Sequence, residues 1–281
     1  MKVLKRVLRI LLGLLLLAVF CFGFSRFYAV APKSLTADMQ PRPTQALRYL
    51  EPEESAEPTP QPPAEPTPTP TPVPTVDPES PAGRAEALGL PTPPEIDAAS
   101  WEFILANGDN SIGEYVPENL TQLEGQSFDG RVIDALTALI DDSRAAGYSV
   151  YVSSGYRSYG DQAANFTRIC QNNGVADGKN SKGFYITMPA GCSEHQTGLC
   201  CDLTDRYYET KTSEALEKTA LFQYMSQHCH EFGFILRFPA DKEEITGVMY
   251  EPWHYRYVGM EAAAYITENH LCLEEFLALY Q

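Results

Sequence analysis

The spacing of apolar residues from position 95 onward predicts a mixture of helices and short strands. Leu136, Leu139 and Ile140 recur at helical intervals, which predicts a helix over 129–146. Further helices are predicted over 161–172, 219–231, 260–268 and 273–280. Short apolar or alternating runs predict strands over 148–153, 198–203, 233–238 and 255–258. Because these elements do not alternate strictly, we expect an α+β fold, an antiparallel sheet with flanking helices.

The N-terminal 31 residues have the pattern of an export or anchor segment. Four basic residues precede an uncharged apolar run over 10–24. They are Lys2, Lys5, Arg6 and Arg9. The sequence Ala-Val-Ala over 29–31 resembles a cleavage site, but Pro32 is expected to block the peptidase that would cut there. We therefore expect 1–31 to be a cytoplasmic basic tip and a single transmembrane anchor, with a cleaved signal peptide as the alternative.

Residues 32–94 differ sharply in composition from the rest of the chain. They hold 18 of the 22 prolines, in runs of Pro, Thr and Glu with few apolar residues to bury. Such composition predicts a disordered, extended spacer. The remaining 95–281 is long enough for one substantial core, which the anchor would hold on the cell-wall side of the membrane.

The chain is acidic, with a formal net charge of -16. Binding to nucleic acid relies on clustered Lys and Arg that neutralise phosphates, so nucleic acid is not an expected partner. The sequence also contains no glycine-rich phosphate loop, so no nucleotide is expected to bind.

Two segments with histidine and carboxylates predict a metal site. Zinc in a hydrolase takes three protein ligands and leaves one position open, and His195, Asp202 and His254 can supply such a set. Glu251 is then suited to act as a general base on water. Cys200 shares the strand face of Asp202 and is an alternative ligand. Either histidine alone would more often be structural, and the hypothesis depends on both segments occurring together.

Arg157 lies in a third segment, Ser-Ser-Gly-Tyr-Arg-Ser over 153–158, which follows a predicted strand and ends in a turn. A guanidinium in such a loop can bind a carboxylate or stabilise an oxyanion. In isolation it would be interpreted as a surface arginine.

Together these segments resemble the VanY-type D-alanyl-D-alanine carboxypeptidases over about residues 100–281. The resemblance is carried by Ser154-Gly155-Tyr156-Arg157-Ser158, by Ser193 to Asp202, and by Glu251-Pro252-Trp253-His254-Tyr255-Arg256. It implies Zn²⁺ in a cleft, held by His195, Asp202 and His254. The other roles that it implies are catalytic base and acid for Glu251, substrate or transition-state stabilisation for Arg157, and lining of the site for Ser193 and Gln162. Cys200 stands where the family usually has alanine.

The resemblance implies zinc-dependent removal of the terminal D-alanine from peptidoglycan stem peptides. Three alternatives stay open: a D-Ala-D-Ala dipeptidase, a peptidoglycan endopeptidase, and a non-catalytic zinc-containing module that binds the cell wall. Retention of Glu251 and Arg157 argues against the last, because a module that only binds needs no base beside an open zinc position.

The cysteines outside the anchor give one further expectation. Cys170 and Cys192 flank a segment with several glycines, and outside the cytoplasm a disulfide between them could form. We therefore expect a Cys170–Cys192 bridge beside the site. Cys200, Cys201 and Cys229 fall in predicted core elements and are expected to be buried free thiols.

Overall fold

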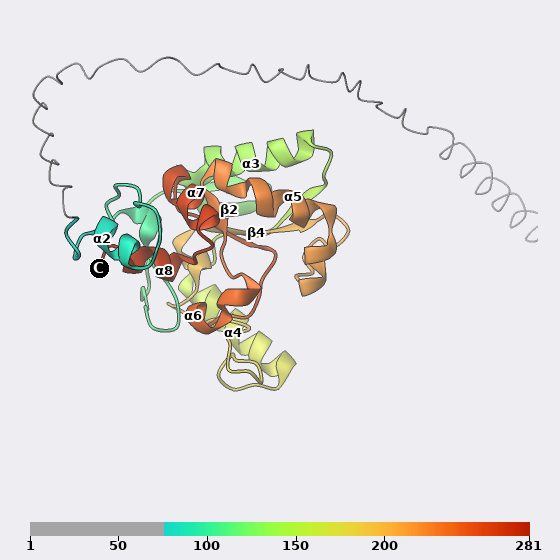
Figure 1. The fold of residues 1–281 in the computed structure, drawn as a ribbon. Helices are drawn as coiled ribbons and strands as arrows, with labels where there is room; N and C mark the ends of the chain where they lie inside the picture. Colours follow the sequence, from blue (N-terminus) through green and yellow to red (C-terminus); the bar gives the residue numbers. More distant parts are fainter. Residues whose placement is uncertain (1–75) are drawn as a thin grey trace, which may run out of the picture. The chain divides into compact units, whose positions relative to one another are not determined.

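The computed structural model describes residues 76–281, so the expected anchor over 1–31 and residues 32–75 of the expected spacer over 32–94 lie outside the described residues. Within the described part, no helix is both long and apolar enough to cross a bilayer. The helices are α2 (Pro81–Ala87), α3 (Ile133–Ala145), α4 (Tyr159–Asn173), α5 (Ala220–His228), α6 (Glu243–Thr246), α7 (Met260–Glu268) and α8 (Leu273–Ala278). Figure 1 shows how they surround a central sheet.

The sheet is antiparallel throughout, in the strand order β3-β4-β6-β5, and a separate hairpin pairs β1 with β2. The strands are β1 (Leu120–Leu123), β2 (Gln126–Asp129), β3 (Val150–Ser154), β4 (Cys200–Asp205), β5 (Phe234–Leu236) and β6 (His254–Tyr257). The α+β class with an antiparallel sheet, expected from the sequence, is therefore confirmed.

The two faces of the sheet have different chemistry. Cys201 and Leu203 of β4 and Tyr255 of β6 point into an apolar core with residues of α3 and α5. The alternate positions Asp202 and His254 are buried polar residues on the opposite face. Figure 1 shows α3 and α5 on one side of the sheet and α4 and α6 on the other. The apolar face thus supports the sheet from behind, while the polar face is available for chemistry.

The predicted helices and strands are present, with ends displaced by a few residues. The helix expected over 129–146 is α3, which a 3-10 turn over Gly130–Val132 precedes. The hairpin of β1 and β2 and the short helices α2 and α6 are not predicted by the apolar pattern.

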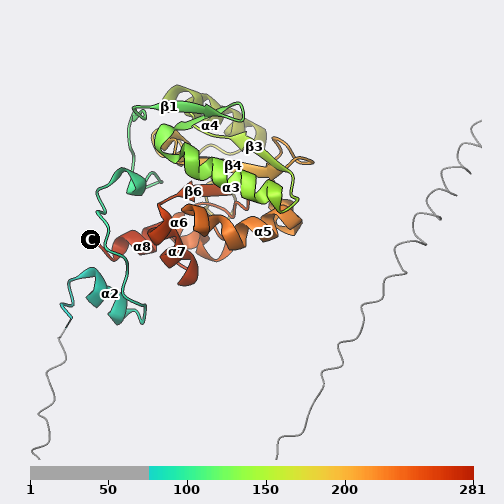
Figure 2. The same ribbon diagram turned by 90° about the horizontal axis from the view of Figure 1, so that it is seen from above.

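The predicted boundary between spacer and domain at residue 94 is wrong, because residues before it pack on the C-terminal helices. Ser80 caps α2 by accepting a hydrogen bond from the Gly83 amide at 3.1 Å. Ala85 is fully buried in an apolar cluster with residues of α7 and α8. The Tyr280 hydroxyl donates to the Pro94 carbonyl at 2.6 Å. Figure 2 shows α2 beside α8.

The predicted Cys170–Cys192 disulfide is also wrong, because all six cysteines in residues 76–281 are free and buried. The segment between these two cysteines is held by other contacts. The Ile186 amide donates to the Gly178 carbonyl at 2.8 Å, and Tyr185 pairs with Val248 in an isolated bridge. Hydrogen bonding and packing therefore fix this segment without a covalent link.

The packing of α2 predicts a position-specific effect of one substitution. Ala85→Asp places an uncompensated carboxylate in the apolar cluster and should lower the free energy of unfolding by about 3–5 kcal/mol. Ala87→Asp makes the same change at an exposed position of the same helix and should alter it by less than about 0.5 kcal/mol. Denaturant unfolding of both variants checks this, and equal effects would mean that α2 does not pack as described.

Candidate active site

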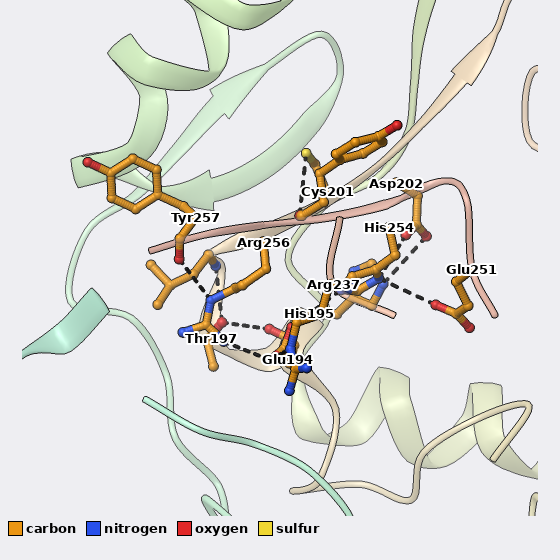
Figure 3. A network of polar contacts seen from close by, with 12 residues as sticks. Glu194, His195, Thr197, Cys201, Asp202, Arg237, Glu251, His254, Arg256 and Tyr257 are labelled. Atoms are coloured by element: carbon orange, nitrogen blue, oxygen red, sulfur yellow. Dashed lines mark hydrogen bonds and ion pairs between the residues drawn. The ribbon is translucent and has the colours of Figure 1, made fainter. Parts of the chain in front are cut away.

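The pairing of β4 with β6 brings two predicted metal ligands face to face. Asp202 is directly opposite His254 in the antiparallel register. Oδ1 of Asp202 lies 3.1 Å from Nδ1 of His254, and its Oδ2 lies 3.4 Å from Nε2 of His195. Burial alone would raise the pKa of Asp202, but the two imidazoles outweigh it and hold that pKa below its usual range. Figure 3 shows these side chains converging.

His195 is oriented from its other ring nitrogen. It lies in a buried 3-10 turn over Glu194–Thr197, and its Nδ1 is 2.7 Å from the Gly155 carbonyl oxygen. When Nδ1–H donates to that carbonyl, Nε2 faces Asp202 with a lone pair that could bind a metal ion. Gly155 is required there, because a Cβ would lie 2.5 Å from the Ser127 carbonyl oxygen.

His254 is oriented in the same way by Glu194. Nε2 of His254 lies 3.4 Å from Oε2 of Glu194, and neither atom has a hydrogen-bond partner elsewhere in the described part of the chain. With Nε2 directed to a carboxylate, Nδ1 is the atom directed to Asp202.

Two buried arginines hold Glu194 in place. Its Oε1 accepts from Nε of Arg237 and from a terminal nitrogen of Arg256, both at 2.8 Å. Arg237 also donates twice to Glu274, at 2.8 and 2.6 Å. Burial alone would raise the pKa of Glu194, but the arginines and His254 outweigh it, so the net shift is downward and Glu194 stays ionised.

The residues present fit a zinc ion. Donor atoms of His195, Cys200 and His254 all lie within 4.8 Å of one another, and Asp202 contacts both imidazoles. Nitrogen, sulfur and carboxylate oxygen are the donors that zinc takes in proteins. Each histidine has one nitrogen directed to a partner outside the cluster, as metal-binding histidines do.

Glu251 lies beside this cluster without being part of it. One carboxylate oxygen of Glu251 is 3.6 Å from Nδ1 of His254. The backbone amide of Glu251 donates to the Phe238 carbonyl at 3.0 Å. Burial raises the pKa of Glu251 to about 7, with Asp202 adding to the rise and His254 opposing it. A carboxylate with such a pKa can both accept and return a proton near neutral pH.

Arg157 lines the same cleft as Glu251 and is held there by a short hydrogen-bond network. Its guanidinium donates to Oε1 of Gln162 at 2.6 Å and to Oγ of Ser154 at 3.2 Å. Its amide donates to the His195 carbonyl at 3.0 Å, which ties this loop to the histidine turn. Gln162 in turn donates to the Met188 carbonyl.

A cleft of about 330 Å³ is shared by Arg157, Glu251 and the predicted metal ligands. The residues predicted from the sequence all line it: Arg157, Gln162, Ser193, His195, Asp202, Glu251 and His254. Sequence reasoning missed the walls formed by Tyr185, Met188 and Phe238.

Sequence reasoning also missed the supporting roles of Glu194, Arg237 and Arg256. Arg237 and Arg256 are fully buried although each lies at or within a strand. An arginine inside an otherwise apolar strand pattern is the signal that could have indicated a buried partner of opposite charge.

Comparison with known proteins decides the family. The family model of the VanY D-alanyl-D-alanine carboxypeptidases matches residues 125–260. A D-alanyl-D-alanine carboxypeptidase of Enterococcus faecalis is 37% identical over 193 residues, which cover 64% of this chain and 67% of that protein. This chain belongs to the VanY family. The enzyme class and family predicted from the sequence are thereby confirmed.

Solved structures of VanY proteins share the fold. VanYB in complex with D-alanine-D-alanine is 37% identical, with a TM-score of 0.55 over 64% of this chain and 98% of that chain. A mutant of the D,D-pentapeptidase VanY from a VanB-type resistance cassette, solved with Zn(II), is 36% identical. Its TM-score is 0.53, and the match covers 63% of this chain and 99% of that chain. The VanY chain described here is accordingly a zinc metallopeptidase, as predicted.

The buried carboxylate of Glu194 predicts a coupled loss of stability and metal binding in this VanY protein. Glu194→Gln removes the charge that Arg237 and Arg256 share, and should lower the free energy of unfolding by about 3–5 kcal/mol. It should also weaken zinc binding by about 10- to 100-fold, because His254 loses its orienting partner. Denaturant unfolding and zinc titration against a competing chelator measure the two effects.

Glu124→Gln is the matched control, because Glu124 pairs with Arg144 at the surface. It should cost less than about 1 kcal/mol and leave zinc binding unchanged. Equal behaviour of the two variants would contradict the orienting role of Glu194.

Proposed function

We propose that this VanY protein removes the terminal D-alanine from peptidoglycan stem peptides, using zinc held by His195, Asp202 and His254. The observation that carries the proposal is the register of β4 and β6, which sets Asp202 opposite His254 in a cleft that Arg157 and Glu251 also line.

Zinc, when bound, supplies Lewis-acid chemistry that polarises the scissile carbonyl and activates water. Glu251 accepts the proton of the attacking water and later delivers it to the leaving amine of D-alanine. A carboxylate oxygen of Glu251 lies 3.6 Å from Nδ1 of His254. This distance supports the role, because it places the carboxylate next to the proposed zinc ligands without making it one of them.

Arg157 binds the anionic parts of the reaction. Its guanidinium faces the same cleft as Glu251 and can donate to the C-terminal carboxylate of the substrate or to the developing oxyanion. Gln162 and Ser154 fix its orientation, and Ser193 lines the cleft beside the histidine turn.

The test is the product pattern of the full chain with and without a chelator. The substrates are a stem pentapeptide ending in D-Ala-D-Ala, the free dipeptide D-Ala-D-Ala, the tetrapeptide that remains after one cleavage, and a cross-linked stem. Chelator-sensitive release of D-alanine from the pentapeptide, faster than any other cleavage, supports the proposal. Preferred cleavage of the dipeptide or of the cross-link would replace it with the corresponding alternative activity. Zinc binding without any cleavage would favour the wall-binding module.

Glu251→Gln should separate catalysis from metal binding. The change removes the base and keeps the size of the side chain, so turnover should fall by about 100- to 10,000-fold. Zinc should stay near one ion per chain, whereas His195→Ala should lose zinc and activity together. Elemental analysis beside D-alanine release checks both variants, and loss of zinc in Glu251→Gln would make the glutamate a ligand.

We further propose that residues 1–31 anchor the protein in the cell membrane and that the catalytic domain lies on the cell-wall side. The basic residues before the apolar run and the unfavourable Pro32 at the cleavage position support this. Mass spectrometry of the membrane-extracted protein should recover peptides that precede Ala31. A mature N-terminus at Pro32 as the main species would contradict the anchor and leave export intact.

A further inference from the structure

Cys200 is a buried thiol at the metal cluster to which the proposed function gives no role. It lies on β4 two residues before Asp202 and shares its face of the strand. Donor atoms of Cys200, His195 and His254 all lie within 4.8 Å of one another. The residue is only 1% exposed, and it is not among the residues that line the cleft. The thiol therefore contacts the cluster from its buried side.

The adjacent Cys201 shows that this placement is specific. Its Sγ lies 3.8 Å from the Tyr255 carbonyl oxygen, and the side chain belongs to the apolar core with Phe128 and Leu203. Two neighbouring thiols of one strand are thus equally buried, and only Cys200 faces the imidazoles.

We propose that Cys200 is an additional zinc ligand, bound as a thiolate from the buried side while the cleft side stays open for substrate. The inference rests on the zinc site of the proposed function. Thiolate sulfur and imidazole nitrogen are both preferred zinc donors. On binding, the S–H bond breaks, its proton passes to solvent, and the sulfur lone pair forms the bond to zinc, so neither oxidant nor reductant is consumed.

A sulfur ligand would make this site bind zinc more tightly than His195, Asp202 and His254 could alone. Loss of an indirect partner of a metal ligand already weakens zinc binding by about 10- to 100-fold. Loss of the Cys200 thiolate should therefore weaken it by about tenfold or more.

The experiment compares the full chain with its Cys200→Ala and Cys201→Ala variants. Zinc is removed with a chelator and replaced by cobalt(II), whose absorption reveals a bound thiolate through a sulfur-to-cobalt charge-transfer band in the near ultraviolet. The band should be present in the unaltered chain and in Cys201→Ala, and absent in Cys200→Ala. Zinc titration against a competing chelator should show weakening only in Cys200→Ala, with circular dichroism checking that both variants are folded.

A cobalt-loaded chain without this band, or a band that persists in Cys200→Ala, would overturn the inference. So would equal zinc affinity in all three proteins. None of these outcomes would affect chelator-sensitive D-alanine release. The ligand role of Cys200 can therefore be disproved while the proposed function stands. Failure of all three proteins to bind either metal would overturn both.

Discussion

The antiparallel pairing of β4 and β6 is the constraint on which the site depends. Because side chains alternate along a strand, one register sends Cys201 and Tyr255 into the core and Asp202 and His254 to the opposite face. A slip by one residue would reverse both sets, burying carboxylate and imidazole against α3 and α5. The apolar core that stabilises the sheet therefore also selects the geometry of the proposed zinc ligands.

A second buried layer keeps those ligands oriented. Glu194 lies between His254 and the arginines Arg237 and Arg256, and the histidine turn reaches the Gly155 carbonyl through His195. Buried charges are costly to desolvate, and such networks persist where every member has a partner. Contacts between residues that are distant in the sequence thus determine which imidazole nitrogen faces the metal cluster.

Local patterns predicted much of this architecture. Helical spacing identified α3, and the apolar run over 198–203 identified β4 and the shared strand face of Cys200 and Asp202. The seven candidate site residues, which the sequence placed in three separate segments, line one cleft.

The features that the sequence did not reveal depend on distant contacts or were hidden by composition. The pairing of Glu194 with Arg237 and Arg256 is set by tertiary packing alone. The start of α2 was hidden by the surrounding prolines, although Ser80 and Pro81 form an ordinary helix start. The Cys170–Cys192 pairing is wrong as well, since two cysteines that flank one segment of the sequence need not meet the geometry of a disulfide.

Anomalous diffraction at the zinc edge, from crystals grown with zinc, would locate the proposed zinc ion where β4 and β6 pair. We expect one strong peak bonded to Nε2 of His195, Asp202 and Nδ1 of His254. A peak elsewhere, or one bonded through Nε2 of His254, would contradict this position.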